Sequence, residues 1–209
     1  MLEILTQPTV EPVTVDECKF WARLDGNAFD LALPGMIAAA RAFCEQEIGA
    51  KIITQVWREE WLQWPTYAGK SPTAYTGTYT GAGGTYLGAG GQKIHLYPVR
   101  SVSVSYWDGA AWVFIDPTML TLIKDSYGVM FTPNVGFFYP TIGITNGPAV
   151  RADFTVGMTS DPAQVPAGIK QFIAAHVAFW ARNPEAATER TMVASPYLAS
   201  LLDSYRTFL

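Results

Sequence analysis

The chain has 209 residues, enough for one sizeable hydrophobic core or for two small units that share one. Apolar residues make up 49% of it and charged residues only 15%, which argues against a disordered chain; its net charge of −4, without a basic stripe, argues against tight DNA binding. Seven Trp and ten Tyr in so weakly charged a chain favour a surface partly covered by partners, although one monomeric core could also hold them.

No membrane signal is visible. The N-terminal MLEILTQP lacks the positive region and long apolar run of a signal peptide. The most apolar segments, around Ile37 and Ile173, contain charged residues and fall short of about 20 residues. We therefore expect no membrane span. Cys18 and Cys44 fall on apolar helical stripes with no further ligands nearby, which favours buried thiols over a metal pair. Two such thiols lead us to expect synthesis in the cytoplasm.

Capping signals predict two helices in the first fifty residues. Thr14 and Glu17 have the spacing of a capping box, which predicts a helix over residues 15–24. A second helical stretch covers roughly residues 28–48, and the glycine that follows it is a good terminator. Because Pro34 interrupts this stretch, we expect either a short helix followed by a longer one from near Pro34, or a kinked helix.

From residue 51 onward, β-branched and aromatic residues replace the helical pattern. Short strand candidates are separated by Gly, Pro, Asn and Asp, and they lie at residues 52–64, 93–99, 101–116, 119–125, 127–133 and 149–158. Asp108-Gly109 predicts a hairpin turn, because glycine supplies the positive φ angles that such a turn needs. Together these stretches predict an antiparallel β unit, a sandwich or a barrel-like sheet.

Helical periodicity returns near the C-terminus. Pro166 is suited to the first position of a helix that Asn183-Pro184 ends. Its apolar stripe comprises Ile169, Phe172, Ile173, His176, Val177 and Trp180. A last helix is predicted from Ser195-Pro196, with Leu198, Leu201, Leu202 and Tyr205 on one face.

These elements predict an α+β fold. Residues 1–50 and 160–209 form a small, discontinuous helical bundle, and residues 51–159 form an inserted antiparallel β unit. The insert includes a Gly/Thr/Tyr-rich loop at residues 69–92.

This loop reads YTGTYTGAGGTYLGAGG over residues 75–91. It does not match a phosphate-binding loop, because the next lysine, Lys93, leads into a strand and no G-x-G-x-x-G spacing is complete. Two interpretations stay open: a flexible linker, or a loop that becomes ordered against a neighbouring subunit. In the second case Tyr75, Tyr79 and Tyr86 are the candidate contacts.

No catalytic constellation is present, so we expect no enzyme activity, no cofactor and no metal. His95 lies in a predicted strand, and His176 lies on an apolar helical stripe as a packing residue. Glu59 and Glu60 are neighbours on a strand and point to opposite faces, which is wrong for a cooperating carboxylate pair. An enzyme would need one of the histidines beside a carboxylate in a pocket.

Several stretches together resemble the head-tail connector (adaptor) proteins of long-tailed double-stranded DNA bacteriophages. They are EPVTVDECKFWARLD, MIAAARAFCEQEIGAKIITQVWR, VPAGIKQFIAAHVAFWARNPEA and YLASLLDSYR, which cover the two ends of the chain, roughly half of it. Their order and spacing carry the resemblance. The insert at residues 69–92 is longer than the family pattern leads us to expect, and Pro34-Gly35 breaks a helix that is usually continuous.

The resemblance implies a structural role in the virion neck. It implies a closed ring of twelve copies between the portal protein and the tail's stopper or terminator protein, with double-stranded DNA passing through without specific binding. It also implies that the C-terminal segment docks on the portal. The candidate portal contacts are Tyr197, Leu198, Leu201, Leu202, Tyr205, Phe208 and Leu209, and the loop tyrosines become candidates for subunit or tail contact.

A conduit for DNA benefits from not attracting phosphates, so we expect neutral or acidic lumen positions. A continuous inner ring of Lys51, Lys70, Lys93 and Arg100 would contradict this expectation. Two other interpretations stay open. The C-terminal helix could close its own subunit's core, and the chain could be a β-rich aromatic module of a tail that binds glycan or protein.

Overall fold

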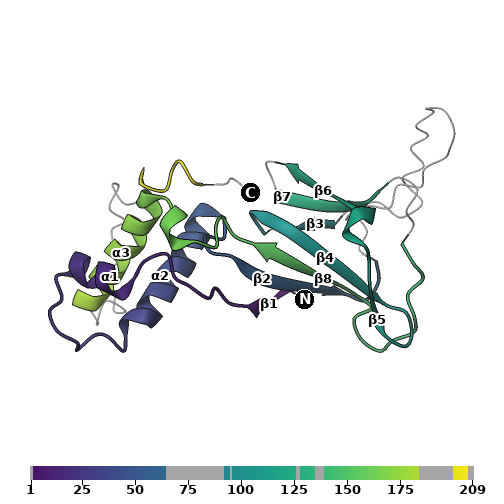
Figure 1. The fold of residues 1–209 in the computed structure, drawn as a ribbon, viewed down its shortest axis with the longest axis horizontal. Helices are drawn as coiled ribbons and strands as arrows, with labels where there is room; N and C mark the ends of the chain where they lie inside the picture. The colour runs from purple at the N-terminus through teal and green to yellow at the C-terminus, as the bar shows by residue number, and fades with distance from the viewer. Residues whose placement is uncertain are drawn as a thin grey trace. The chain divides into compact units, whose positions relative to one another are not determined.

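The computed structural model describes residues 2–64, 92–94, 96–125, 128–134, 139–183 and 200–206. The chain divides into two units, each made of segments that are distant in sequence (Figure 1). The helical unit comprises Pro8–Thr54 and Gly157–Phe208, and the sheet unit comprises Met1–Gln7 and Gln55–Val156. The α+β fold expected from the sequence is thereby confirmed.

Three helices build the helical unit, with α3 at its centre. They are α1 (Val15–Ala22), α2 (Leu33–Ile48) and α3 (Ala167–Arg182), with a short 3₁₀ turn, η3, at Pro162–Gln164. Both α1 and α2 pack mainly against α3. The core between them is apolar and fully buried at Leu33, Ile37, Cys44, Ile48, Ile169, Ile173 and Val177.

Local signals set the helix ends. The Thr14 hydroxyl accepts from the Glu17 amide at 3.1 Å, and the Glu17 carboxylate accepts from the Thr14 amide at 2.7 Å, so the predicted capping box is confirmed. The α1 helix ends two residues earlier than expected, because Arg23 takes a left-handed conformation with φ 51°. Residues 28–32 form turns, so a single helix starts at Leu33, and it ends at the left-handed Gly49, φ 67°.

Two antiparallel sheets build the sheet unit. The larger sheet has the order β1-β2-β8-β4-β5, from β1 (Leu2–Thr6), β2 (Gln55–Trp61), β8 (Val150–Val156), β4 (Val99–Trp107) and β5 (Trp112–Phe114). The smaller has the order β3-β7-β6, from β3 (Gln92–Ile94), β7 (Gly128–Pro133) and β6 (Leu120–Asp125), with a 3₁₀ turn, η2 (Pro117–Met119), before β6. The β4–β5 hairpin turns at Gly109, φ 111°, as the sequence predicts.

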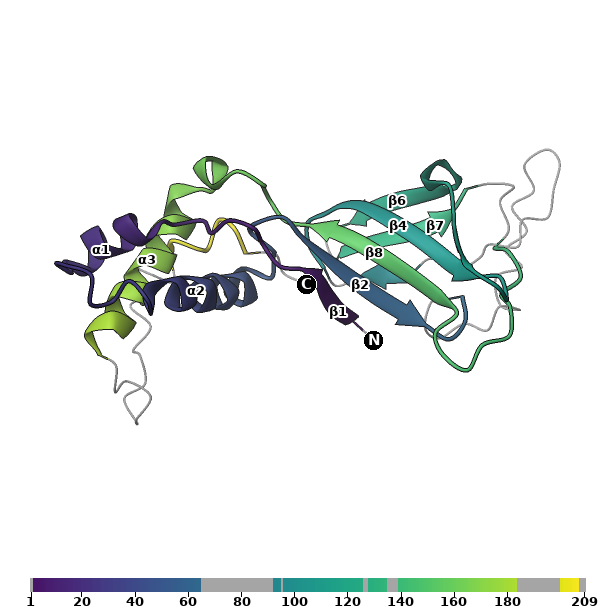
Figure 2. The same cartoon turned by 60° about the horizontal axis from the view of Figure 1, so that its bottom comes forward.

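The two faces of the larger sheet differ. Along the central strand β8, alternate residues are buried on the inner face, namely Val150, Ala152, Phe154 and Val156. These pack into one core with Leu120 and Leu122 of β6, so the smaller sheet covers this face at β8 and β4 (Figure 2). The outer face carries Arg151, Asp153 and Thr155, all half-buried.

The unit boundaries differ from the expected ones at three places. Residues 2–7, expected with the helices, contribute β1 to the sheet unit. Residues 51–54 and 157–159, expected in the insert, belong to the helical unit. There the two segments run side by side, because the Thr54 backbone amide donates to the Thr159 carbonyl at 2.9 Å and the Thr159 backbone amide donates to the Ile52 carbonyl at 3.1 Å.

Candidate functional site

The described part of the C-terminal segment packs on its own helical unit. Leu202 is fully buried, and Leu201 and Tyr205 are half-buried. A Cβ at Gly168, at the start of α3, would lie 3.1 Å from the Leu201 carbonyl oxygen and 3.4 Å from the Tyr205 ring, so the segment lies close over this glycine. Arg206 also pairs with a carboxylate oxygen of Glu47 on α2 at 3.5 Å. Leu202 therefore serves the core of its own chain, and only Leu201 and Tyr205 of these three keep accessible surface.

Several candidate contacts fall outside the described residues. They are Tyr75, Tyr79 and Tyr86 of the glycine-rich loop, Tyr197 and Leu198 before the C-terminal segment, and Phe208 and Leu209 after it. The same holds for His95 and Lys70, and for the side chain of Lys93. Lys51 and Arg100 are the other two members of the inner ring of cations that would contradict a neutral or acidic lumen. They lie in different units: Lys51 pairs with Glu45 in the helical unit, and Arg100 is exposed on β4.

His176 is a packing residue, as the sequence suggests. It is 4% exposed, and its Nδ1 lies 2.9 Å from the Phe172 carbonyl oxygen. Its ring contacts those of Phe172, Phe43 and Trp180, with centroids 4.1, 5.2 and 6.0 Å away. This aromatic setting holds the imidazole between helices α2 and α3.

The adjacent glutamates of β2 do not face each other. Glu59 and Glu60 lie on opposite faces of β2, one across from Ala152 and the other across from Arg151. Among the described residues, no group of three or more His, Cys, Asp and Glu could hold a metal ion. None of the helices in the described ranges is long and apolar enough to cross a membrane.

Both cysteines are buried, as predicted. Burial raises the pKa of the Cys18 thiol to about 11 and that of the Cys44 thiol to about 12. Each is a free thiol with no exposed surface, so both behave as small apolar side chains in the helical core.

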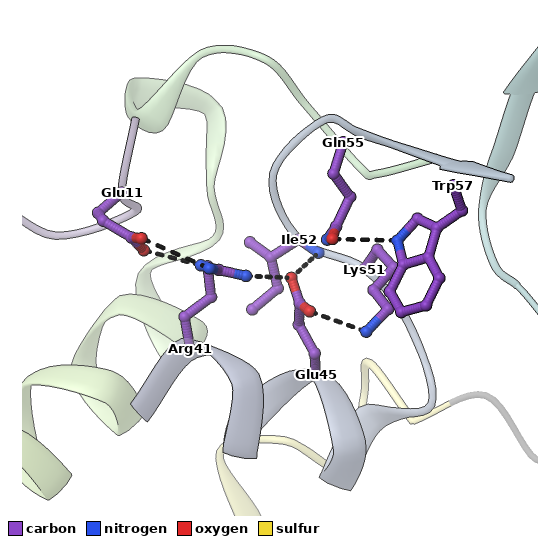
Figure 3. Close-up of polar contacts among 7 residues, drawn as sticks. All are labelled: Glu11, Arg41, Glu45, Lys51, Ile52, Gln55 and Trp57. Atoms are coloured by element: carbon purple, nitrogen blue, oxygen red, sulfur yellow. Dashed lines mark hydrogen bonds and ion pairs between the residues drawn. The ribbon is translucent and has the colours of Figure 1, made fainter. Parts of the chain in front are cut away.

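A buried ion network fixes the chain where it leaves α2 (Figure 3). Glu45 is 3% exposed, and its carboxylate accepts from Arg41 at 3.2 Å, from Lys51 at 3.1 Å and from the Ile52 amide at 3.1 Å. Arg41 also donates to Glu11 at 2.8 Å. Burial alone would lower the pKa of Arg41, but the carboxylates of Glu11 and Glu45 raise it above its usual value. The network joins the segment before α1, the α2 helix and the segment that follows α2.

Arg58 of β2 and Arg151 of β8 lie on the outer face of the larger sheet, and each is engaged within the sheet. Arg58 on β2 donates twice to Asp153 on β8, at 2.7 and 2.8 Å, and this hydrogen bonding raises the pKa of Arg58. Arg151 donates to the Ser105 hydroxyl at 2.9 Å and lies over the ring of Trp112, 4.2 Å from its centroid. Neither of these two guanidinium groups is left as an isolated positive charge.

The two edges of the larger sheet carry exposed apolar side chains. On β1, Leu2 is 45% exposed, Ile4 40% and Leu5 42%. On β5, at the other edge, Phe114 is 65% exposed. The sequence interpretation missed β1, because five residues before a proline give too short a pattern; the alternation of Leu2 and Ile4 was the only available signal.

Comparisons with protein-family profiles and with curated proteins found no match. Among solved structures, a chain in the neck of the empty gene transfer agent (GTA) particle, computed with C6 symmetry, matches with a TM-score of 0.70 and 20% identity. Chains in the virion of the native GTA particle and in the neck of the native particle, computed with C12 symmetry, match with TM-scores of 0.65 and 0.64, at 20% and 19% identity. Each match covers 100% of this chain and 96% of the other. Over its whole length, this chain has the fold of a chain from the neck of GTA particles.

Proposed function

We propose that this chain is a non-enzymatic connector of a phage-like neck, a ring-forming adaptor that joins a DNA-filled head to its tail. One observation carries the proposal: the full-length similarity in fold to neck chains of GTA particles. A match to only the helical unit or only the sheet unit would be weak, because either part alone could serve many functions. Here both units match together, over 96% of the other chain.

Ring formation is supported by the symmetry of those necks, which were computed with C6 and C12 symmetry. A closed ring needs head-to-tail contacts, so each copy must present two different complementary surfaces. We propose twelve copies, with the portal protein on one side and the tail's stopper or terminator protein on the other. The C-terminal segment, through Tyr197, Leu198, Leu201, Tyr205, Phe208 and Leu209, is the proposed portal contact.

Passage of DNA is supported by charge. Twelve copies at −4 would carry roughly −48 in total, which disfavours binding of phosphates. On the outer face of the larger sheet, Arg58 is neutralised by Asp153, and Arg151 lies over Trp112. A channel wall built from such a surface would let the duplex slide without holding it.

The test is removal of this chain from the particle that encodes it. We expect filled heads and complete tails that remain separate, and we expect joined particles to return when the chain is supplied in trans. Electron microscopy of the two fractions gives the readout, with quantification of the chain in gradient-purified particles. Joined, infective or DNA-transferring particles without the chain would overturn the proposal, as would finding the chain only outside the neck.

A further inference from the structure

Among the described strands, β1 and β5 form the two edges of the larger sheet, and their apolar side chains lie on opposite faces. On the β1 edge, Leu2 pairs with Glu59, and Ile4 pairs with Trp57, which faces Phe154 of the buried core. Leu2 and Ile4 therefore lie on the inner face. They extend beyond the core that the smaller sheet covers, and both stay at least 40% exposed.

The β5 edge has the reverse arrangement. Phe114 pairs with Ser105, which pairs with Arg151, and Trp112 pairs with Trp107. Because Arg151 is an outer-face residue of β8, Phe114, Trp112 and Trp107 lie on the outer face. The rings of Trp107 and Trp112 meet edge to face at 5.9 Å, so this edge carries an aromatic surface with Phe114 at its rim.

Extension of the sheet by strand pairing is disfavoured at both edges. The β1 edge carries a charged residue, Glu3, on its outer face, and β5 has only three residues, two devices that limit edge-to-edge pairing. Packing of side chains is the remaining way to cover the exposed apolar surface. Such packing needs a partner whose own exposed apolar side chains, on the outer face of a sheet edge, can lie against the inner face of β1.

A second copy of this chain offers that surface. We propose that neighbouring copies overlap, with the inner face of the β1 edge of one copy lying on the outer face of the β5 edge of the next. The inference rests on the proposed ring, because a head-to-tail contact requires two different surfaces, and these lie at opposite edges of one sheet. The overlap ends at β4 and β8, where Ser101, Ser103 and Asp153 make the outer face polar.

Photo-crosslinking within assembled particles tests the contact. Ile4→Cys in the full-length chain is labelled with a benzophenone maleimide, and the native Cys18 and Cys44 stay unlabelled because they are buried. We expect a ladder of covalent oligomers of this chain after illumination, with the crosslink mapping to residues 112–114 of a neighbour. Leu31→Cys, at a 97% exposed position in the helical unit, is the matched control and should give no product at residues 112–114.

If labelled chain is present in joined particles but Ile4 links only to another protein, only within its own chain, or not at all, the inference is wrong while the proposed function stands. If the chain is absent from the neck, the proposed function itself fails.

Charge substitution gives a second test. Ile4→Lys and Phe114→Glu change exposed side chains, so each variant should fold, which circular dichroism and thermal unfolding verify. We expect each single variant to reduce incorporation into particles several-fold. The double variant should be incorporated better than either single variant, because opposite charges then meet across the contact. The overlap would be contradicted if the double variant were incorporated no better than the less well incorporated of the two single variants.

Discussion

Replacing Glu45 with alanine should destabilise the helical unit more than any surface substitution. Glu45 is 3% exposed and joins Arg41, Lys51 and the Ile52 amide. Its loss leaves the Ile52 amide buried without this acceptor, which costs about 1–3 kcal/mol. Removing one member of a buried ion pair costs about 3–5 kcal/mol. Arg41 keeps Glu11 as a partner, so we expect a total near the lower limit, about 3 kcal/mol.

Thermal and urea unfolding of the full chain measure this loss. At about 2–4 °C per kcal/mol for a chain of this size, the midpoint should fall by about 6–12 °C. Glu45→Gln is the matched control: it retains an oxygen for the Ile52 amide and loses only the charge, so its cost should be smaller. If Glu45→Ala costs less than about 1 kcal/mol, the network does not fix the segment after α2, and the reasoning fails.

Three further outcomes are expected. Thr14→Ala removes an N-cap and should lower the free energy of unfolding by about 1 kcal/mol in urea titrations, whereas Thr14→Ser should be nearly neutral; equal effects would argue against capping. Asp153→Ala frees Arg58 on the outer face and should increase retardation of duplex DNA at low salt, an increase that the added change Arg58→Ala should abolish; unchanged mobility would show that this face does not meet DNA. Cys18 and Cys44 should not react with a thiol reagent at pH 8 in the native protein, because burial raises the pKa of both, and both should react in guanidinium; rapid native labelling would contradict their burial.

The sequence predicted those parts of the fold that depend on neighbouring residues. The Thr14–Glu17 capping box, the stop at Gly49 and the hairpin at Gly109 each need only a few adjacent positions, and all three are confirmed. Pro166 lies one residue before its helix rather than at its first position, a difference within the usual uncertainty of helix ends.

What the sequence could not show are contacts between distant positions. Glu11 and Arg41 are 30 residues apart, and nothing in either segment marks them as partners. The two apolar sheet edges were missed for the same reason, because the faces of β1 and β5 become defined only through the register with β2, β8 and β4. The apolar face of the C-terminal segment fitted either its own core or a partner, and Leu202 turned out to be buried in its own chain.

The order of the elements along the chain affects how the protein is made. Arg182, near the end of α3, donates to the Ala22 carbonyl at the end of α1, 160 residues earlier, and the central strand β8 emerges only shortly before α3. A ribosome that has reached residue 149 has therefore released neither the strand that joins β2 to β4 nor the helix against which α1 and α2 pack. Both units are completed within the same short stretch of translation, so the nascent chain keeps its apolar faces uncovered until late. Such a chain should depend on chaperones during synthesis more than one whose units are contiguous.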